Sequence, residues 1–303
     1  MSRLVNPYRF GLPSISSRRW RVRIIGAPDI WLDIAAIEMA ATIGGADQCT
    51  GGPIIANNGL FTNSSNMIDG NNSTYGEYHA FNNLLNSGPT IDFLSAKVVK
   101  EVRIRVANTF VTRGPSAIVV DTFDGVSTYT PVFWGINTTP YTANSLKTFT
   151  LRVIPMTQAT TPFWSLNVTE TNNAGFNGIA AFNLRASSGG ANLSEGAAPW
   201  ASASNGDSSG YGPPPYAFDA NASTFYYCST GVAGVYKSRL MATHAVAPNP
   251  THFMLQARPS FTADTPKDFT LDYSLDGCLT WTTAKTITGA TGWGNSESRE
   301  YAL

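Results

Sequence analysis

Hydrophobic residues make up 43% of the 303-residue chain and charged residues only 13%, with 20 basic and 20 acidic side chains in balance. A balanced chain without a basic run has no electrostatic footprint for a phosphate backbone, so we exclude nucleic-acid binding. No apolar run is long enough to span a bilayer and no apolar signal-peptide region follows Met1, so we expect a soluble protein made in a cytosol, without membrane insertion.

The first segment, residues 1–17, is a polar lead-in punctuated by Pro and Ser, with the period of neither a strand nor a helix. Its Tyr8, Arg9 and Phe10 are unlike typical linker residues and suit a short arm that docks on a partner. The alternative is a floppy terminus.

From residue 18 onward, the pattern is that of short strands separated by Gly, Asn, Ser and Pro clusters, without sustained helical periodicity. The first series of predicted strands comprises 20–25, 34–39, 91–93, 102–106, 117–120 and 149–154. The second series comprises 164–168, 253–257, 269–273, 279–282 and 300–302. We therefore predict an all-β protein.

The two series belong to a duplicated unit, because three blocks recur in the same order. These blocks are 35–47 with 180–192, 68–74 with 218–224, and 115–121 with 266–272. The period is far longer than that of solenoid repeats, which indicates two separate domains. We predict domains at 18–155 and 162–303 joined by a linker at 156–161, which is so short that the domains should touch.

The motifs inside these units indicate a family. The second unit has an Asp turn after Phe218, a Pro-led strand at 266–271, and an Asp-Gly turn before Trp281. The first unit keeps the Asp turn, Ile-Asp-Phe at 91–93 and Asp124-Gly125, with Tyr129 in place of the Trp. Across 18–303 this set resembles the galactose-binding-like (discoidin, or coagulation-factor C-type) domain, which implies two tandem jelly-roll β-sandwiches behind the N-terminal arm.

The order of the elements departs from that family. A strand like 20–24, followed by a segment like 37–39, usually ends the domain but here begins each unit, as in a circular permutation. This arrangement behind an Asn-Pro-Tyr-Arg-Phe arm is similar to bacteriophage tail and virion-surface proteins. The resemblance implies a virion protein of the tail, baseplate or fibre, made in the host cytoplasm, with other virion proteins as partners and a homo-oligomer in the particle.

The Asp turns gather oxygen atoms of the kind that Ca²⁺ binds. They comprise Asp69, Asn71 and Thr74 in the first unit and Asp219, Asn221 and Thr224 in the second. The resemblance implies a structural Ca²⁺ closed by a Glu from the edge strand, which Glu38 matches, whereas the second unit has Asn183. The alternative is that Asp and Asn cap the turn by binding its own backbone.

Aromatic residues in or near loops are candidates for ligand contact, because a sugar ring needs an apolar platform with polar neighbours. The ligand-binding candidates are Tyr78, His79, Trp200, Tyr211, Tyr226 and Trp293. Contact with a neighbouring subunit is an equal alternative, since interfaces also favour Tyr and Trp. Trp20, Trp164 and Trp281 lie in strand patterns, and we expect them in the core.

The sequence contains no motif that predicts an enzyme. Its three histidines are isolated, and its three cysteines match no zinc or catalytic spacing, so we expect buried cysteines and no catalysis. The hypotheses that remain are recognition of host-surface polysaccharide and a purely structural role as a tail or capsid spacer. A weaker one is a host-encoded carbohydrate-binding module.

Overall fold

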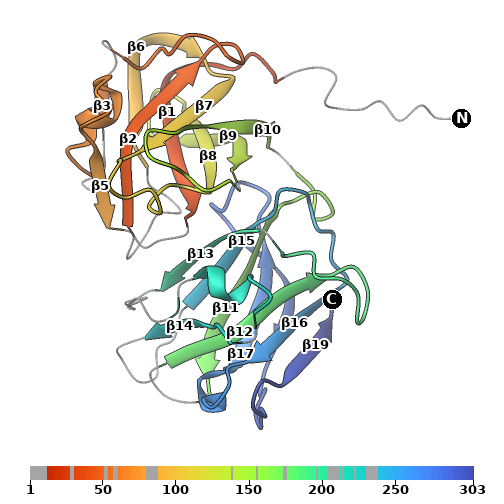
Figure 1. Ribbon diagram of the computed structural model, residues 1–303. Coiled ribbons are helices and arrows are strands. Elements are labelled where there is room, and N and C mark those ends of the chain that lie inside the picture. Colours follow the sequence, from red (N-terminus) through yellow and green to blue (C-terminus); the bar gives the residue numbers. More distant parts are fainter. Residues whose placement is uncertain are drawn as a thin grey trace, which may run out of the picture.

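The computed structural model (Figure 1) describes most of the chain. The described residues are 12–27, 31–50, 54–56, 61–79, 88–137, 139–154, 156–172, 176–195, 197–203, 212, 214–221, 223–229 and 238–303. Tyr8, Arg9, Phe10 and Tyr211 lie outside them, so the predicted docking arm and one predicted ligand contact are not described.

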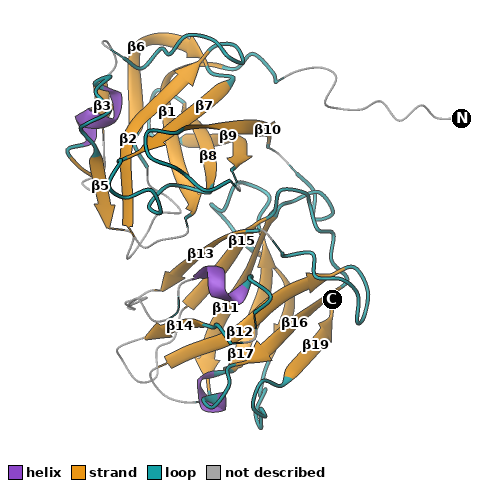
Figure 2. Ribbon diagram, viewed as in Figure 1, coloured by secondary structure: helices purple, strands orange, loops and turns teal. Residues whose placement is uncertain are grey.

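The predicted all-β class is confirmed. In the described part of the chain, helical turns are limited to the short 3₁₀ segments η2 (Ser64–Ile68), η4 (Pro214–Ala217) and η5 (Thr262–Asp264) (Figure 2). None of the helices in the described ranges has the length and apolar character needed to cross a membrane.

The first half of the chain forms one curled antiparallel sheet. Its strands are β1 (Ser16–Gly26), β2 (Trp31–Ala40), β3 (Ile54–Ala56), β4 (Phe61–Thr62), β5 (Gly76–His79), β6 (Thr90–Val98), β7 (Glu101–Val106), β8 (Ala117–Phe123), β9 (Tyr129–Ile136) and β10 (Leu146–Val153). Their order is β3-β6-β1-β8-β9-β10-β7-β2-β5-β4. Strand β10 pairs with β7 through its first four residues and with β9 through its last four, so it turns the corner and curls the sheet into a half-barrel.

The second half forms two separate sheets. Its strands are β11 (Phe163–Thr171), β12 (Phe176–Arg185), β13 (Ala198–Ala203), β14 (Tyr226–Ser229), β15 (Ser238–Thr243), β16 (His252–Ala257), β17 (Pro266–Tyr273), β18 (Thr282–Ile287) and β19 (Ser298–Ala302). The sheet orders are β13-β15-β11-β17-β18 and β14-β12-β16-β19. The first half repeats both orders as β3-β6-β1-β8-β9 and β5-β2-β7-β10, so the sequence duplication corresponds to a duplicated strand topology.

Each half has its own hydrophobic core, built on a central strand. Alternate residues of β1, including Trp20 and Val22, point into the first core, and Trp164 and Leu166 of β11 do the same in the second. Both tryptophans are fully buried, as expected for strand residues on the inner face of a sheet. All three cysteines are buried thiols, as predicted.

The two halves contact each other across the outer face of β1. A third hydrophobic cluster joins Ile25 and Trp134 of the first half to Phe163 and Cys278 of the second. The rings of Trp134 and Phe163 meet edge to face, with centroids 5.6 Å apart. Because apolar residues of both halves are buried here, this joint holds the two halves together at the point where they meet in Figure 1.

Candidate functional site

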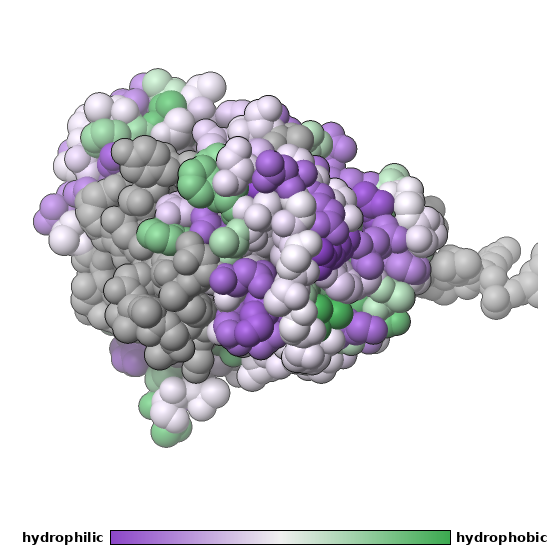
Figure 3. All heavy atoms as spheres, turned by 90° about the horizontal axis from the view of Figure 1, so that it is seen from below, coloured by the Kyte–Doolittle hydropathy of each residue, from purple (hydrophilic) through white to green (hydrophobic). Residues whose placement is uncertain are grey.

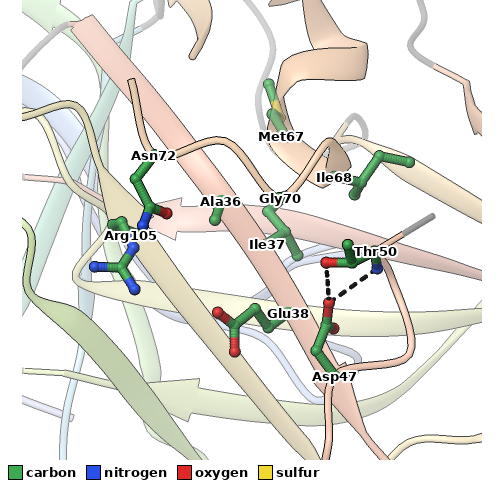
Figure 4. Close-up of a pocket in the computed structure, with 10 residues that line it drawn as sticks. All are labelled: Ala36, Ile37, Glu38, Asp47, Thr50, Met67, Ile68, Gly70, Asn72 and Arg105. Atoms are coloured by element: carbon green, nitrogen blue, oxygen red, sulfur yellow. Dashed lines mark hydrogen bonds between the residues drawn. The ribbon is translucent and has the colours of Figure 1, made fainter. Parts of the chain in front are cut away.

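A cavity of about 240 Å³ opens in the first half, between strand β2 and the turn that follows η2 (Figure 4). Strand β2 and the loop after it, η2 and its turn, and strand β7 supply its lining. The lining residues are Ala36, Ile37, Glu38, Asp47, Thr50, Met67, Ile68, Gly70, Asn72 and Arg105. The cavity thus combines an apolar floor with carboxylate, amide and guanidinium groups.

The floor and the polar wall arise from strand periodicity. Ile37 points into the first core and packs in the same cluster as Met67 of η2, whereas the next residue, Glu38, is only half-buried. Arg105 of β7 enters from the neighbouring strand, because β2 and β7 are paired from Ile34 to Ala40. Glu38 and Arg105 thus share the outer face of the paired strands β2 and β7, whereas Ile37 lies on the core face.

Asp47 fixes the loop that borders the cavity. One carboxylate oxygen accepts hydrogen bonds from the backbone N–H groups of Met39 and Cys49, at 3.0 and 2.9 Å. The other accepts from the N–H and hydroxyl of Thr50, at 2.9 and 2.8 Å, the two bonds drawn in Figure 4. Since both oxygens are engaged, Asp47 holds the loop in place.

Glu38 and Arg105 are the charged groups best placed for a ligand. Glu38 Oε2 lies 3.1 Å from Arg103 Nε, so its carboxylate is anchored on one side. Arg105 is held by a hydrogen bond from Nη1 to the carbonyl oxygen of Asn144. Anchored side chains lose little freedom when a ligand binds, which favours recognition.

In each Asp turn, the polar side chains accept hydrogen bonds from groups of the same turn. In the first half, Asp69 accepts from the Asn71 N–H at 2.7 Å and from the Thr74 hydroxyl at 2.7 Å. Asn71 Oδ1 in turn accepts from the Ser73 N–H at 3.0 Å. The second half repeats this pattern, with Asp219 accepting from Asn221 and Thr224.

These hydrogen bonds bear on the calcium prediction, because they hold the turns in shape without a metal, while each Asp69 oxygen keeps a further lone pair. Glu38 is paired with Arg103 and faces the same cavity as Arg105, whose positive charge opposes a cation. The described residues contain no group of three or more His, Cys, Asp or Glu side chains placed to hold a metal ion. The Asp turns thus satisfy their own hydrogen bonds without a metal, and calcium binding stays a prediction.

The second half has the same backbone around this position but different chemistry. The duplication aligns Glu38 with Asn183 and Asp47 with Asn192, and the strand registers align Arg105 with Gln256. Phe182 and Phe218 take the places of Ile37 and Ile68. Their rings pack edge to face in the core, with centroids 5.7 Å apart. The combination of Glu38 and Arg105 is therefore specific to the first half. The second half has amides at these two positions, a carboxylate, Glu195, in place of Thr50, and larger apolar side chains at 182 and 218.

Two side chains that were predicted to contact a ligand are buried in the core, so these predictions are wrong. Tyr226 and Trp293 both lie in the second hydrophobic core. The Tyr226 hydroxyl lies 3.1 Å from the Ser238 hydroxyl, and Trp293 Nε1 donates to the Ala290 carbonyl at 3.1 Å. A local Gly- and Ser-rich context suggested a loop surface for Trp293, but the ring folds inward against the sheet.

The remaining predicted ligand contacts are only partly described. Tyr78 and His79 belong to strand β5 and Trp200 to strand β13, but their side chains lie outside the described part of the structure. Asp47 and Arg105 are site residues that the sequence reasoning missed. The signal was available, because both positions are charged in the first unit and amide in the second.

Comparisons with protein-family models, with curated proteins and with solved structures give no match. The function of this chain is therefore inferred from its residues and geometry.

Proposed function

We propose that this chain is a non-enzymatic bacteriophage virion protein that recognises a host-surface glycan through the cavity of its first half. It would comprise two tandem galactose-binding-like jelly-roll sandwiches behind a docking arm at residues 1–17. The repeated five- and four-strand orders support the tandem arrangement. The first strand of each unit, β1 or β11, sits in the middle of its sheet, which is compatible with a permuted chain order.

The observation that supports glycan recognition is the difference between the two halves at the cavity. The duplicated backbone is retained, yet only the first half lines this position with Glu38 and Arg105, beside the half-buried apolar residues Ala36 and Ile68. A sugar presents hydroxyl groups on its edges and C–H groups on its faces. The carboxylate would accept hydroxyl hydrogens, the guanidinium would donate to hydroxyl oxygens, and the apolar floor would contact C–H groups.

The size of the cavity suits a small ligand. Its volume of about 240 Å³ is below the ~300–1,000 Å³ typical of sites for drug-sized molecules. A single sugar residue of a polysaccharide is of this class. Weak binding at each copy would be multiplied if the chain forms a homo-oligomer on the particle and contacts other virion proteins through its arm.

A structural role is the second candidate, and the joint between the halves favours it. The contact between the halves consists of buried residues, which include Arg23, Ile25, Phe163 and Cys278. A spacer in a tail or capsid needs such a fixed geometry. This role requires no ligand in the cavity.

A glycan array probed with the full chain and with variants of the cavity would separate the two functions. The substitutions Glu38→Asn and Arg105→Gln introduce the residues that the second half has at these positions, so the fold should tolerate them. The control is Arg18→Gln, which removes an exposed arginine of the same half. We expect the wild type and the control to bind the same glycans and both cavity variants to lose at least fivefold in affinity; absence of any wild-type binding would contradict recognition and favour the structural role.

A further inference from the structure

The second half carries an exposed aromatic cluster at the ends of three strands. Its members are Phe176 at the start of β12, Phe225 and Tyr227 at the start of β14, Arg258 just after β16, and Phe261 just before η5. Among the residues that the structure describes, the exposed aromatic side chains are Phe176, Tyr216 and Phe261, all in this half. On the end seen in Figure 3, the coloured hydrophobic residues form small separate patches among hydrophilic ones.

A guanidinium group holds these rings in place. The Cζ atom of Arg258 lies 3.8 Å from the centroid of the Phe225 ring and 4.2 Å from that of Phe261. It lies 4.9 Å from the centroid of Tyr227, which stacks on Phe176 with centroids 5.3 Å apart. The rings and the guanidinium therefore form one cation–π assembly, in which each ring is ordered before any ligand arrives.

The charge of Arg258 is balanced inside the cluster. Its Nη1 lies 3.2 Å from Oδ2 of Asp264, a buried carboxylate in η5. The paired charges leave no net attraction for an anionic or cationic ligand at this point. The surface that remains is apolar and aromatic.

The outer face of Phe261 is open. Its side chain is 54% exposed although Arg258 covers one face of the ring, so the exposed area belongs to the other face and the edge. Phe176 is 36% exposed at the other end of the stack. A flat, fixed and accessible aromatic face is what a pyranose ring stacks on through its C–H groups.

The first half shows that this exposure is not required by the fold. Phe110 stands four residues after β7 as Phe261 stands four residues after β16, and an arginine, Arg113, lies 4.0 Å from its ring centroid. Arg113 is paired with Asp33 at 2.8 Å. Phe110, however, is only half-exposed and meets Tyr75 edge-on, with centroids 6.4 Å apart. The arginine–ring–aspartate arrangement is thus common to both halves, and the open ring is specific to the second.

We propose that Phe261, backed by Arg258, is a stacking platform for a neutral pyranose ring, and so a second glycan-binding site. This inference rests on the proposed glycan recognition but uses a surface in the other half of the chain. Together the cavity and the platform would contact two residues of a polysaccharide, or two chains, with higher avidity than either alone.

Saturation-transfer difference NMR on the full chain tests this proposal with maltotriose, cellotriose and galactotriose as probes. We expect saturation of ring C–H protons by the wild type and at least a fivefold loss with Phe261→Ala. Phe261→Trp keeps a flat ring and should retain the signal. The control is Leu94→Ala, which removes an equally exposed apolar side chain, 56% exposed, from the first half.

The cavity variant Glu38→Asn separates this proposal from the proposed function. Binding that survives Glu38→Asn and is lost with Phe261→Ala supports the platform even if the cavity binds no glycan. Binding that is unchanged in Phe261→Ala, or absent in the wild type with all three probes, overturns the platform. Loss with Glu38→Asn alone supports the cavity and leaves the platform refuted.

Discussion

The guanidinium of Arg23, in the first half, donates a 2.7 Å hydrogen bond to the carbonyl oxygen of Gly277, in the second half. Its other nitrogens bind both carboxylate oxygens of Asp121 at 2.8 and 2.9 Å, and all of these side-chain groups are fully buried. One side chain thus links the central strand of the first half, β1, to a turn of the second. The relative position of the cavity and the aromatic platform depends on this joint.

We predict that Arg23→Met lowers the free energy of unfolding by about 3 kcal/mol, because the Asp121 carboxylate then stays buried with less compensation. The control Arg18→Met removes an ion pair with Asp92 from an arginine whose side chain is 54% exposed, and should cost much less, because solvent screens the pair. Denaturant unfolding of both variants measures the difference. Equal losses in the two variants would mean that the buried ion pair contributes no more to stability than the exposed one.

Two glycines provide a second test of the joint. Gly277 and Gly125 both have a positive φ, +67° and +91°, so an alanine at either position is strained. A Cβ at Gly277 would also lie 3.0 Å from Val119 and 3.1 Å from Ile154, whereas nothing lies within 4 Å at Gly125. We expect Gly277→Ala to cost about 1–3 kcal/mol more than Gly125→Ala in thermal or denaturant unfolding; a matched loss would argue against tight packing at the joint.

The burial of His244 leads us to predict that the stability of the protein depends on pH. Its buried ring contacts the Pro162 carbonyl and the Ser194 hydroxyl at 2.9 and 3.2 Å, and burial lowers its pKa from 6.5 to about 4. Between these values the unfolded chain binds a proton that the folded chain does not, so stability is complete above about pH 6.5 and falls as the pH drops toward 4. The loss should approach about 3 kcal/mol.

Denaturant unfolding at pH 7, 6 and 5 measures this dependence. The variant His244→Gln should be less stable at neutral pH but should lose this part of the slope. The matched variant His252→Gln removes a less buried histidine and should keep it. A slope that is the same in all three proteins would assign the pH dependence to other groups.

The Asp turns should hold their shape without metal, because their carboxylates accept hydrogen bonds from the turns themselves. We expect millimolar CaCl₂ or EDTA to shift Tm by less than about 1 °C, since only a ligand that prefers the folded state stabilises it. Asp69→Ala should cost about 1 kcal/mol whether calcium is present or not. A rise in Tm with calcium that disappears in Asp69→Ala would establish the metal site that the sequence suggested.

Filling the cavity should remove binding without removing the fold. Ile68→Phe introduces the residue that the second half has at this position, where Phe218 packs edge to face with Phe182. We expect an unchanged circular dichroism spectrum, a change in stability of less than about 1.5 kcal/mol, and loss of glycan binding. Retained binding in this variant would place the glycan elsewhere.

The sequence predicted the features that depend on local pattern and on repetition. Alternation around Trp20 and Trp164 predicted strands at β1 and β11, and the repeated blocks predicted the duplication. Strand β18 was placed too early, because Asp276 accepts the Thr280 N–H and extends the turn to Trp281. Strand β9 was missed because Pro131 and Gly135 interrupt its pattern.

Features that depend on distant residues could not be predicted in this way. Arg21 and Arg23 alternate with the core residues of β1, but their burial could not be predicted, because their partner Asp121 is about a hundred residues away. Gly277, which Arg23 also contacts, is in the other half. At the site, Glu38, which was predicted as a calcium ligand, lines the cavity. Arg105 was missed because strand pairing, and not chain proximity, brings it to Glu38.

The most direct test of glycan recognition is a map of amide chemical-shift changes on the full chain, titrated with the best glycan from the array. If the cavity binds the glycan, chemical-shift changes should saturate together at Ile37, Glu38 and Asn72 and around Arg105. No comparable set should occur at Asn183 and Gln256 in the second half. Changes confined to other surfaces, or none at concentrations that saturate the array signal, would contradict this prediction.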